Sequence, residues 1–256
     1  MKSAPAYGVR SRRSSENAGV RLTARTYGKA RIGTYAEKAG GHITVESDAE
    51  RLVAHLLNID PRVRSFRQQP FTVDLIGGRL LFTTQEVSEA RRMRGGRTGD
   101  AEYTPDFVTV QDNGLQRAYE VKLSGFEGDA RYWSKVDRAR EIMDAYCYPL
   151  SIVVVPADER HPVLVNAQLL KPALLRAGEY LAPDIIAGVE YYCKSGPVLQ
   201  RTLCADLEIA PGMIPLLLVS GVLQADLLHE HICASLEVSA AHGDLSHLHL
   251  IEALQP

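Results

Sequence analysis

Residues 103–123 read YTPDFVTVQDNGLQRAYEVKL, and this stretch decides the fold. Two segments rich in β-branched and aromatic residues, 103–111 and 115–123, flank the tripeptide Asp112-Asn113-Gly114. Such a tripeptide favours the positive φ angles of a tight hairpin turn. We therefore expect an antiparallel strand pair with a three-residue loop, in the register that places Asp106 opposite Glu120.

This register predicts a metal site. Two carboxylates directly across a strand pair lie about 5 Å apart and repel each other unless a proton or a cation lies between them. Side chains alternate along a strand, so Glu120 and Lys122 point to one face while Val121 points into the core. Carboxylate oxygens favour Mg²⁺ or Mn²⁺. The pattern predicts phosphodiester hydrolysis, in which the ion lowers the pKa of a bound water and Lys122 positions the nucleophile.

Two further polar residues are candidates for the site, and each has a structural alternative. Glu50 lies in the first turn of an expected helix, where it either adds a carboxylate to the metal or closes a capping box with Ser47. Gln69 either contacts the site or only precedes a strand. On a later expected helix, Arg131, Lys135 and Arg138 share a face that suits a phosphate backbone.

The surrounding sequence predicts an α/β core with a mixed sheet covered on its faces by helices. Apolar periodicity and turn residues define these elements. We expect a helix at 46–60, strands at 71–76 and 79–83, a basic loop or inserted hairpin at 84–100, a helix at 131–146 and a strand at 150–155.

The chain beyond residue 156 predicts a small, mostly helical, winged-helix-like domain. We expect helices at 166–177 and 183–193, a helix that ends near Ser220-Gly221, a second helix through Leu236, and a strand or wing at 247–253. The expected domains are therefore a basic N-terminal arm at 1–42, the α/β domain at 43–165 and the C-terminal domain at 166–256.

Charge is distributed unevenly along a chain whose formal net charge is only −2. Residues 1–40 carry a net charge of +7, whereas residues 195–256 carry −6. A basic arm favours binding along a phosphate backbone through counterion release, although a solvated tail has the same composition. The acidic end favours a protein partner. The candidate DNA-binding residues are Arg10, Arg12, Arg13, Arg91, Arg92, Arg94, Arg97, Arg131 and Arg138.

Several classes of protein are not favoured by the sequence. The four cysteines form no CxxC pair, and we expect them to be reduced thiols. The N-terminus lacks the apolar stretch of a secretory signal, and no run approaches the roughly 18 apolar residues of a membrane span. The glycine pairs lack the ending of a phosphate-binding loop. We expect a cytoplasmic protein without membrane partners.

Five short motifs resemble one known family over residues 43–156, the TnsA-type endonuclease subunits of heteromeric bacterial transposases. This resemblance implies a restriction-endonuclease-like PD-(D/E)xK fold that cuts double-stranded DNA at the 5′ ends of a transposon, close to the nucleoid. It also implies two partners, a DDE-type transposase (TnsB-like) and an AAA+ ATPase (TnsC-like). The motifs are Glu46-Ser47-Asp48-Ala49-Glu50, Asp60-Pro61-Arg62-Val63, Gln69-Pro70, Tyr103-Thr104-Pro105-Asp106-Phe107 and Tyr119-Glu120-Val121-Lys122.

Carried over by position, the resemblance assigns roles to individual residues. It implies that Glu50, Asp106 and Glu120, with the backbone carbonyl of Val121, bind Mg²⁺ or Mn²⁺, and that Lys122 is the catalytic lysine. Gln69 and Lys135 are accessory positions. Two other functions stay open: a stand-alone nuclease such as a restriction enzyme or junction resolvase, and a non-catalytic DNA-binding scaffold.

Overall fold

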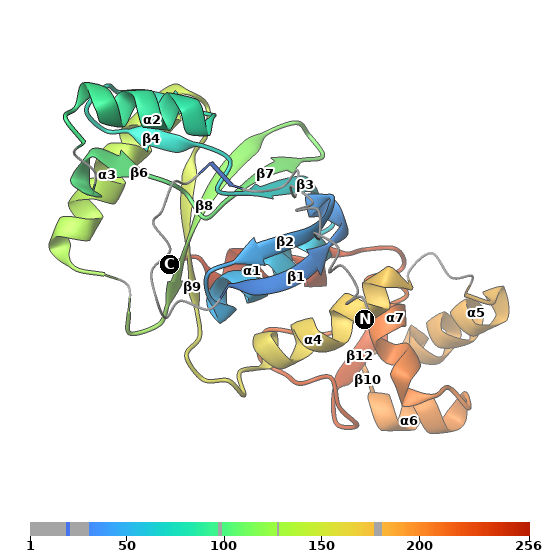
Figure 1. Cartoon of the computed structure of the whole chain (residues 1–256). Coiled ribbons are helices and arrows are strands. Elements are labelled where there is room, and N and C mark those ends of the chain that lie inside the picture. The colour runs from blue at the N-terminus through green and yellow to red at the C-terminus, as the bar shows by residue number, and fades with distance from the viewer. Residues whose placement is uncertain (1–18, 21–30, 97–98, 127, 177–180) are drawn as a thin grey trace, which may run out of the picture.

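The computed structural model describes residues 19–20, 31–96, 99–126, 128–176 and 181–256. At its centre is a four-stranded mixed sheet with the order β3-β7-β8-β9 (Figure 1). β3, β7 and β8 are antiparallel, and β9 runs parallel to β8. The parallel step is bridged by helix α3, Ala130–Ala145. The expected α/β fold with a mixed sheet is confirmed. The strands are β3 Val63–Gln68, β7 Phe107–Gln111, β8 Gln116–Leu123 and β9 Leu150–Val155.

The hairpin of β7 and β8 has the predicted register. Phe107 pairs with Tyr119 and Val110 with Gln116, so Asp106 and Glu120 occupy the next opposed positions. Gly114 closes the turn with φ 82°, in the left-handed region that favours glycine. The turn residues therefore fixed which side chains share a face.

One face of the sheet is covered by α1, Asp48–Ile59. Leu56 and Leu57 of α1 pack in the same core cluster as Phe66, Phe107 and Tyr119 of the sheet. A hairpin of β1, Ile32–Ala36, and β2, Gly41–Val45, packs beside α1 and is joined by η1, Glu37–Ala39 (Figure 1). This hairpin spans the expected domain boundary at residue 42, so part of the predicted arm is folded into the α/β core.

The other face carries α3 and a small three-stranded sheet with the order β5-β4-β6. Phe71, Val73, Val136 and Met143 form the core between them. The expected strand pair after residue 70 is present with shorter strands. These are β4 Thr72–Asp74, β5 Arg79–Leu81 and β6 Glu102–Tyr103.

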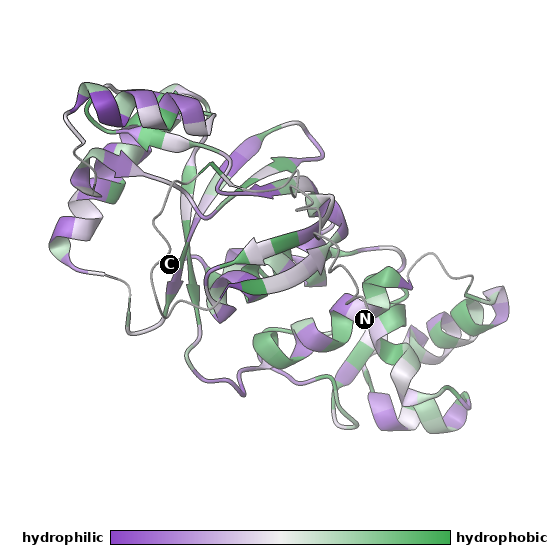
Figure 2. Ribbon diagram, viewed as in Figure 1, coloured by the Kyte–Doolittle hydropathy of each residue, from purple (hydrophilic) through white to green (hydrophobic). Residues whose placement is uncertain are grey.

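Residues 84–100 differ from the expected basic loop or hairpin, because they contain helix α2, Thr84–Met93, before η2, Gly99–Ala101. The Thr83 side chain caps the helix and the Glu86 carboxylate reaches back to the Thr83 backbone, which forms a complete capping box. Val87 and Ala90 are buried beneath the helix, while most of α2 is hydrophilic (Figure 2). Two buried apolar residues among many charged ones are a weak amphipathic pattern, so the sequence did not predict this helix.

The C-terminal part combines short helices with a three-stranded sheet of order β10-β12-β11. The expected helices near 166–177 and 183–193 are present as α4 and α5, and α7 ends just before Ser220-Gly221 as predicted. α4 packs against both α1 and α7, and one core cluster joins the two parts of the protein. The elements are α4 Pro162–Leu175, α5 Pro183–Tyr192, η3 Cys193–Ser195, β10 Val198–Leu199, α6 Gln200–Asp206, η4 Pro211–Met213, α7 Ile214–Val219, β11 Leu223–Gln224, β12 Glu237–Ala240, η5 Ser246–Leu248 and η6 Glu252–Leu254.

Two expectations in the C-terminal part are wrong. The segment up to Leu236 is not a second helix, and residues 247–253 form short 3-10 turns in place of a strand. The reason lies in Asn166, a fully buried residue of α4. Its amide donates to the carbonyls of Leu227 and Glu230 and accepts from the Ile232 N–H. These three backbone groups therefore bond to a side chain of α4 and not to one another within a helix.

Within the residues that the structure describes, no single helix is both long and apolar enough to cross a membrane. Among the same described residues, the sharply bent pair of α6 and residues 211–219 reaches that length and apolarity when its two helices are taken together. All four cysteines are free thiols, as expected.

Candidate active site

Asp106 is held at the point where β7 and β8 begin to pair. Its N–H donates to the Tyr119 carbonyl at 3.0 Å, and its carbonyl accepts the Gln69 N–H at 3.0 Å. Its carboxylate oxygen Oδ2 accepts the Val121 N–H at 2.8 Å. These backbone bonds fix the carboxylate, while the residue stays partly accessible to solvent.

The electrostatic surroundings of Asp106 disfavour its charge. Dehydration of the carboxylate raises its pKa well above the ordinary value, and the nearby negative charges of Glu120 and Glu50 raise it further. The Val121 N–H and the Lys122 ammonium oppose this shift. The crowding of acids that the sequence predicted is therefore present at this end of the hairpin.

Glu120 is buried and points along the same face as Lys122, as predicted. Its Oε1 lies 2.9 Å from the Lys122 Nζ, and its Oε2 accepts the Tyr103 hydroxyl at 2.6 Å. The Tyr132 hydroxyl also donates to Oε1, and the Lys122 ammonium lies 3.9 Å from the Tyr132 ring centroid. Val121, between them, is in the core as expected.

The sequence does not predict that Tyr103 and Tyr132 belong to the site. They come from β6 and α3, two elements that meet over β8 only in the folded protein. Burial and the negative charge of Glu120 raise the pKa of Tyr103 well above its ordinary value, so this phenol remains a hydrogen-bond donor. The only available signal was the position of Tyr103 in the Tyr-Thr-Pro-Asp motif.

Glu50 serves as a helix cap in this structure. The Ser47 hydroxyl accepts the Glu50 N–H at 3.1 Å and donates to Glu50 Oε1 at 3.0 Å. The second carboxylate oxygen accepts the Glu46 N–H at 2.9 Å, in place of the Ser47 N–H of a standard capping box. Because Glu50 also raises the pKa of Asp106, the cap keeps this carboxylate near the site. Its role as a metal ligand stays a prediction.

The residue types fit a hard divalent cation, although their present arrangement does not bring them to one point. Three carboxylates, Glu50, Asp106 and Glu120, lie near the ammonium of Lys122, and the negative charges of Glu50 and Glu120 outweigh this ammonium in their effect on Asp106. Oxygen donors of this kind suit Mg²⁺ or Mn²⁺. In the part of the chain that the structure describes, no three Asp, Glu, His or Cys side chains are grouped to hold an ion as they stand. Binding therefore requires Glu120 to turn away from the tyrosines.

Gln69 lies next to Asp106, to which its backbone is bonded. It has a positive φ of 44° and is buried, and among the described residues its Nε2 has no hydrogen-bond partner. Its carbonyl accepts the Val20 N–H at 2.9 Å. A strained residue with an unsatisfied donor beside the acids is consistent with a site role. The other accessory candidate, Lys135, lies about one helical turn beyond Tyr132 on α3.

The candidate DNA-binding arginines fall into four groups. Arg91 and Arg94 form ion pairs with Glu102, and Arg94 also pairs with Asp74 at 2.8 Å, so both cations have acidic partners within the protein and their contact with DNA stays a prediction. Arg131 pairs with Asp100 at the surface. Arg92 and Arg138 are exposed. Arg10, Arg12, Arg13 and Arg97 lie outside the described residues.

Comparison of the chain with protein-family models and with curated proteins finds no match.

Proposed function

We propose that this protein is a Mg²⁺-dependent DNA endonuclease that cuts phosphodiesters at the 5′ ends of a transposon within a heteromeric transposase. One observation carries the proposal: Asp106 is opposed in register by Glu120, with Lys122 on the same face and Glu50 close enough to influence Asp106. This set joins acids that suit a metal to a cation that suits a phosphate, on a rigid hairpin.

Each residue of the set has a distinct role. Asp106, Glu120 and Glu50 would hold the ion, which when bound polarises a phosphoryl oxygen and acidifies water. Lys122 places its ammonium where negative charge grows on the phosphate or where the nucleophile must be oriented. Tyr103 and Tyr132 hold Glu120 through their hydroxyls until an ion displaces them, and the Val121 N–H orients Asp106.

The order of elements supports a restriction-endonuclease-like core. α1 is followed by the antiparallel strands β3, β7 and β8, then by α3 and the parallel strand β9, with small elements inserted after β3. The transposase context depends on the motif resemblance. The net charge of −6 over residues 195–256 favours a protein partner for the C-terminal part, either the TnsB-like transposase or the TnsC-like ATPase.

Cleavage of a duplex carrying the transposon end tests the proposal. With Mg²⁺ and the partner proteins present, we expect Asp106→Asn and Lys122→Ala to abolish strand cleavage and to leave DNA binding intact. Asp112→Asn is the matched control, because Asp112 is exposed in the turn of the same hairpin. Undiminished cutting by the Asp106 variant would refute the assignment.

The same assay separates the other two functions. Cleavage by the wild type without partners would favour a stand-alone nuclease. No cleavage by a folded, DNA-binding wild type with Mg²⁺ or Mn²⁺ and partners would favour a non-catalytic scaffold.

A further inference from the structure

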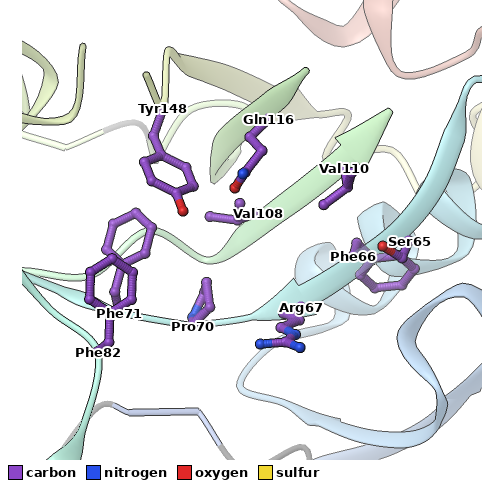
Figure 3. Close-up of a pocket in the computed structure, with 10 residues that line it drawn as sticks. All are labelled: Ser65, Phe66, Arg67, Pro70, Phe71, Phe82, Val108, Val110, Gln116 and Tyr148. Atoms are coloured by element: carbon purple, nitrogen blue, oxygen red, sulfur yellow. The ribbon is translucent and has the colours of Figure 1, made fainter. Parts of the chain in front are cut away.

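A pocket of about 200 Å³ lies over the sheet face that also carries Asp106 and Glu120. Its floor is formed by Val108 and Val110 of β7, and Ser65 and Arg67 of β3 line it from the neighbouring strand (Figure 3). α3 does not line this part of the sheet. The pocket is therefore a recess in the exposed end of the central sheet.

Aromatic rings form one wall of the pocket. Phe71 is buried and makes edge contacts with Phe82 and Tyr148, at centroid distances of 5.6 and 5.0 Å. Phe82 is 48% exposed although it is a large apolar residue, and Pro70 continues the apolar surface beside it (Figure 3). An exposed ring beside a recess offers a face on which a flat group can stack.

The rim of the pocket carries polar groups. In Figure 3 the Tyr148 hydroxyl and the Gln116 amide point toward the space above Val108, and the Arg67 guanidinium lies across the pocket from them. Arg67 is exposed, and no ion pair links it to any other residue that the structure describes. A flat apolar slot with an amide, a hydroxyl and an unpaired cation matches a nucleobase and its phosphate.

The pocket lies close to the acids. Val108 follows Asp106 by two residues, so their Cα atoms are at most about 7 Å apart. Pro70 follows Gln69, whose N–H binds the Asp106 carbonyl. A strand held at Asp106 therefore has its neighbouring nucleotides within reach of the pocket.

We propose that this pocket binds one unstacked base of the DNA strand next to the cut, with Arg67 at the phosphate of that nucleotide. The inference rests on the proposed function for its substrate, DNA. The unpaired Arg67 and the polar rim favour a nucleotide over an apolar side chain of a partner protein, which would leave the cation without a counter-charge. Stacking of this kind tolerates any base, because every base has a flat face.

The test is binding of a fluorescein-labelled hexathymidylate, measured by anisotropy in EDTA so that no cleavage occurs. We expect Phe82→Leu to weaken binding at least about fivefold, since it keeps the apolar bulk and removes the stacking face. Arg67→Ala weakens binding and lowers the salt slope by about one. Arg64→Ala is the matched control, because Arg64 is exposed on the same strand and does not line the pocket.

Tyr148→Phe provides a second variant that keeps the aromatic wall, and we expect it to weaken binding about twofold or more by removing one hydrogen bond. Hexathymidylate binding that is unchanged in Phe82→Leu, Arg67→Ala and Tyr148→Phe overturns the proposal. This is also the result expected if the pocket instead holds a side chain of a partner protein. Because the binding assay contains no metal, failure of base binding at the pocket and failure of the endonuclease assignment are separate results. Weakened binding in Phe82→Leu together with full cleavage by Asp106→Asn would keep the pocket and reject the catalytic assignment.

Discussion

The Tyr103 hydroxyl donates a 2.6 Å hydrogen bond to Oε2 of Glu120 inside the protein. The other oxygen of Glu120 is bonded by the Tyr132 hydroxyl and by the Lys122 ammonium. Both carboxylate oxygens are therefore satisfied by the protein itself, and a metal ion must compete with these donors. This competition makes the metal response of the protein measurable without any assay of cleavage.

Tyr103→Phe should lower the free energy of unfolding by about 1–3 kcal/mol, because it leaves a buried carboxylate oxygen without its donor. We expect Mg²⁺ to recover more of this loss in the variant than it adds to the wild type, since the freed oxygen gains a cation. Urea denaturation with and without Mg²⁺ measures both effects. Tyr35→Phe, at a partly exposed ring on β1, is the control. Equal Mg²⁺ responses in the Tyr103 variant and the wild type would contradict the expectation.

Asp106→Asn should stabilise the protein near neutral pH, because it removes a charge that dehydration, Glu120 and Glu50 all disfavour. The amide oxygen still accepts the Val121 N–H. Since the pKa of Asp106 is raised on folding, wild-type stability falls as the pH rises from about 3.9 through the folded-state pKa, and the variant lacks this fall. Thermal melts across this pH range check the sign. A melting temperature below that of the wild type at pH 7 would show that the carboxylate is favourably paired.

The hairpin and its acids could be predicted because the information is local. Asp112-Asn113-Gly114 sets the register, and the register alone places Asp106 opposite Glu120. The two tyrosines could not be predicted in the same way, because β6 and α3 reach Glu120 through packing that no local pattern encodes. Helix α2 is an intermediate case. The capping box at Thr83 and Glu86 can be recognised in the sequence and indicates a helix start, but the many charged residues that follow favoured a basic loop.

The segment before Leu236 is the reverse case, because a helix was predicted there and none is present. Its composition suits a helix, yet the Asn166 side chain from α4 bonds three of its backbone groups. A single buried amide far away in the sequence thus decides the local structure. Tertiary bonds of this kind override propensity and are not visible in the sequence.

Asn166→Ala should therefore lower the free energy of unfolding by about 2–4 kcal/mol, because two carbonyls and one N–H lose their partner in the interior. The variant should also expose residues 227–232 to hydrogen exchange. Gln168→Ala, at an exposed position of the same helix, should change stability little. Chemical denaturation and amide exchange by mass spectrometry test the two effects. Unchanged protection of this segment would mean that Asn166 does not hold it.

We expect His55 to reduce the stability of the protein in mild acid. Its Nε2 lies 2.9 Å from both the Thr34 hydroxyl and the Lys171 ammonium. Burial, and then the positive charges of Lys171 and Arg51, lower the pKa of His55 from 6.5 to about 4. The unfolded chain therefore binds a proton below about pH 6.5 that the folded protein takes up only near pH 4. The free energy of unfolding falls across this interval, by at most about 1.4 kcal/mol per pH unit for this one group.

Two substitutions separate His55 from the other groups that titrate in this range. His55→Gln keeps a hydrogen-bonding side chain and removes the titration, so the stability profile should flatten between pH 6.5 and 4. Lys171→Met removes one of the charges that oppose protonation, so it should make the slope shallower without abolishing it. Urea denaturation at half-unit pH steps measures both profiles. A wild-type slope that persists in His55→Gln would assign the acid sensitivity to other residues, and a steeper slope in Lys171→Met would contradict the electrostatic account of His55.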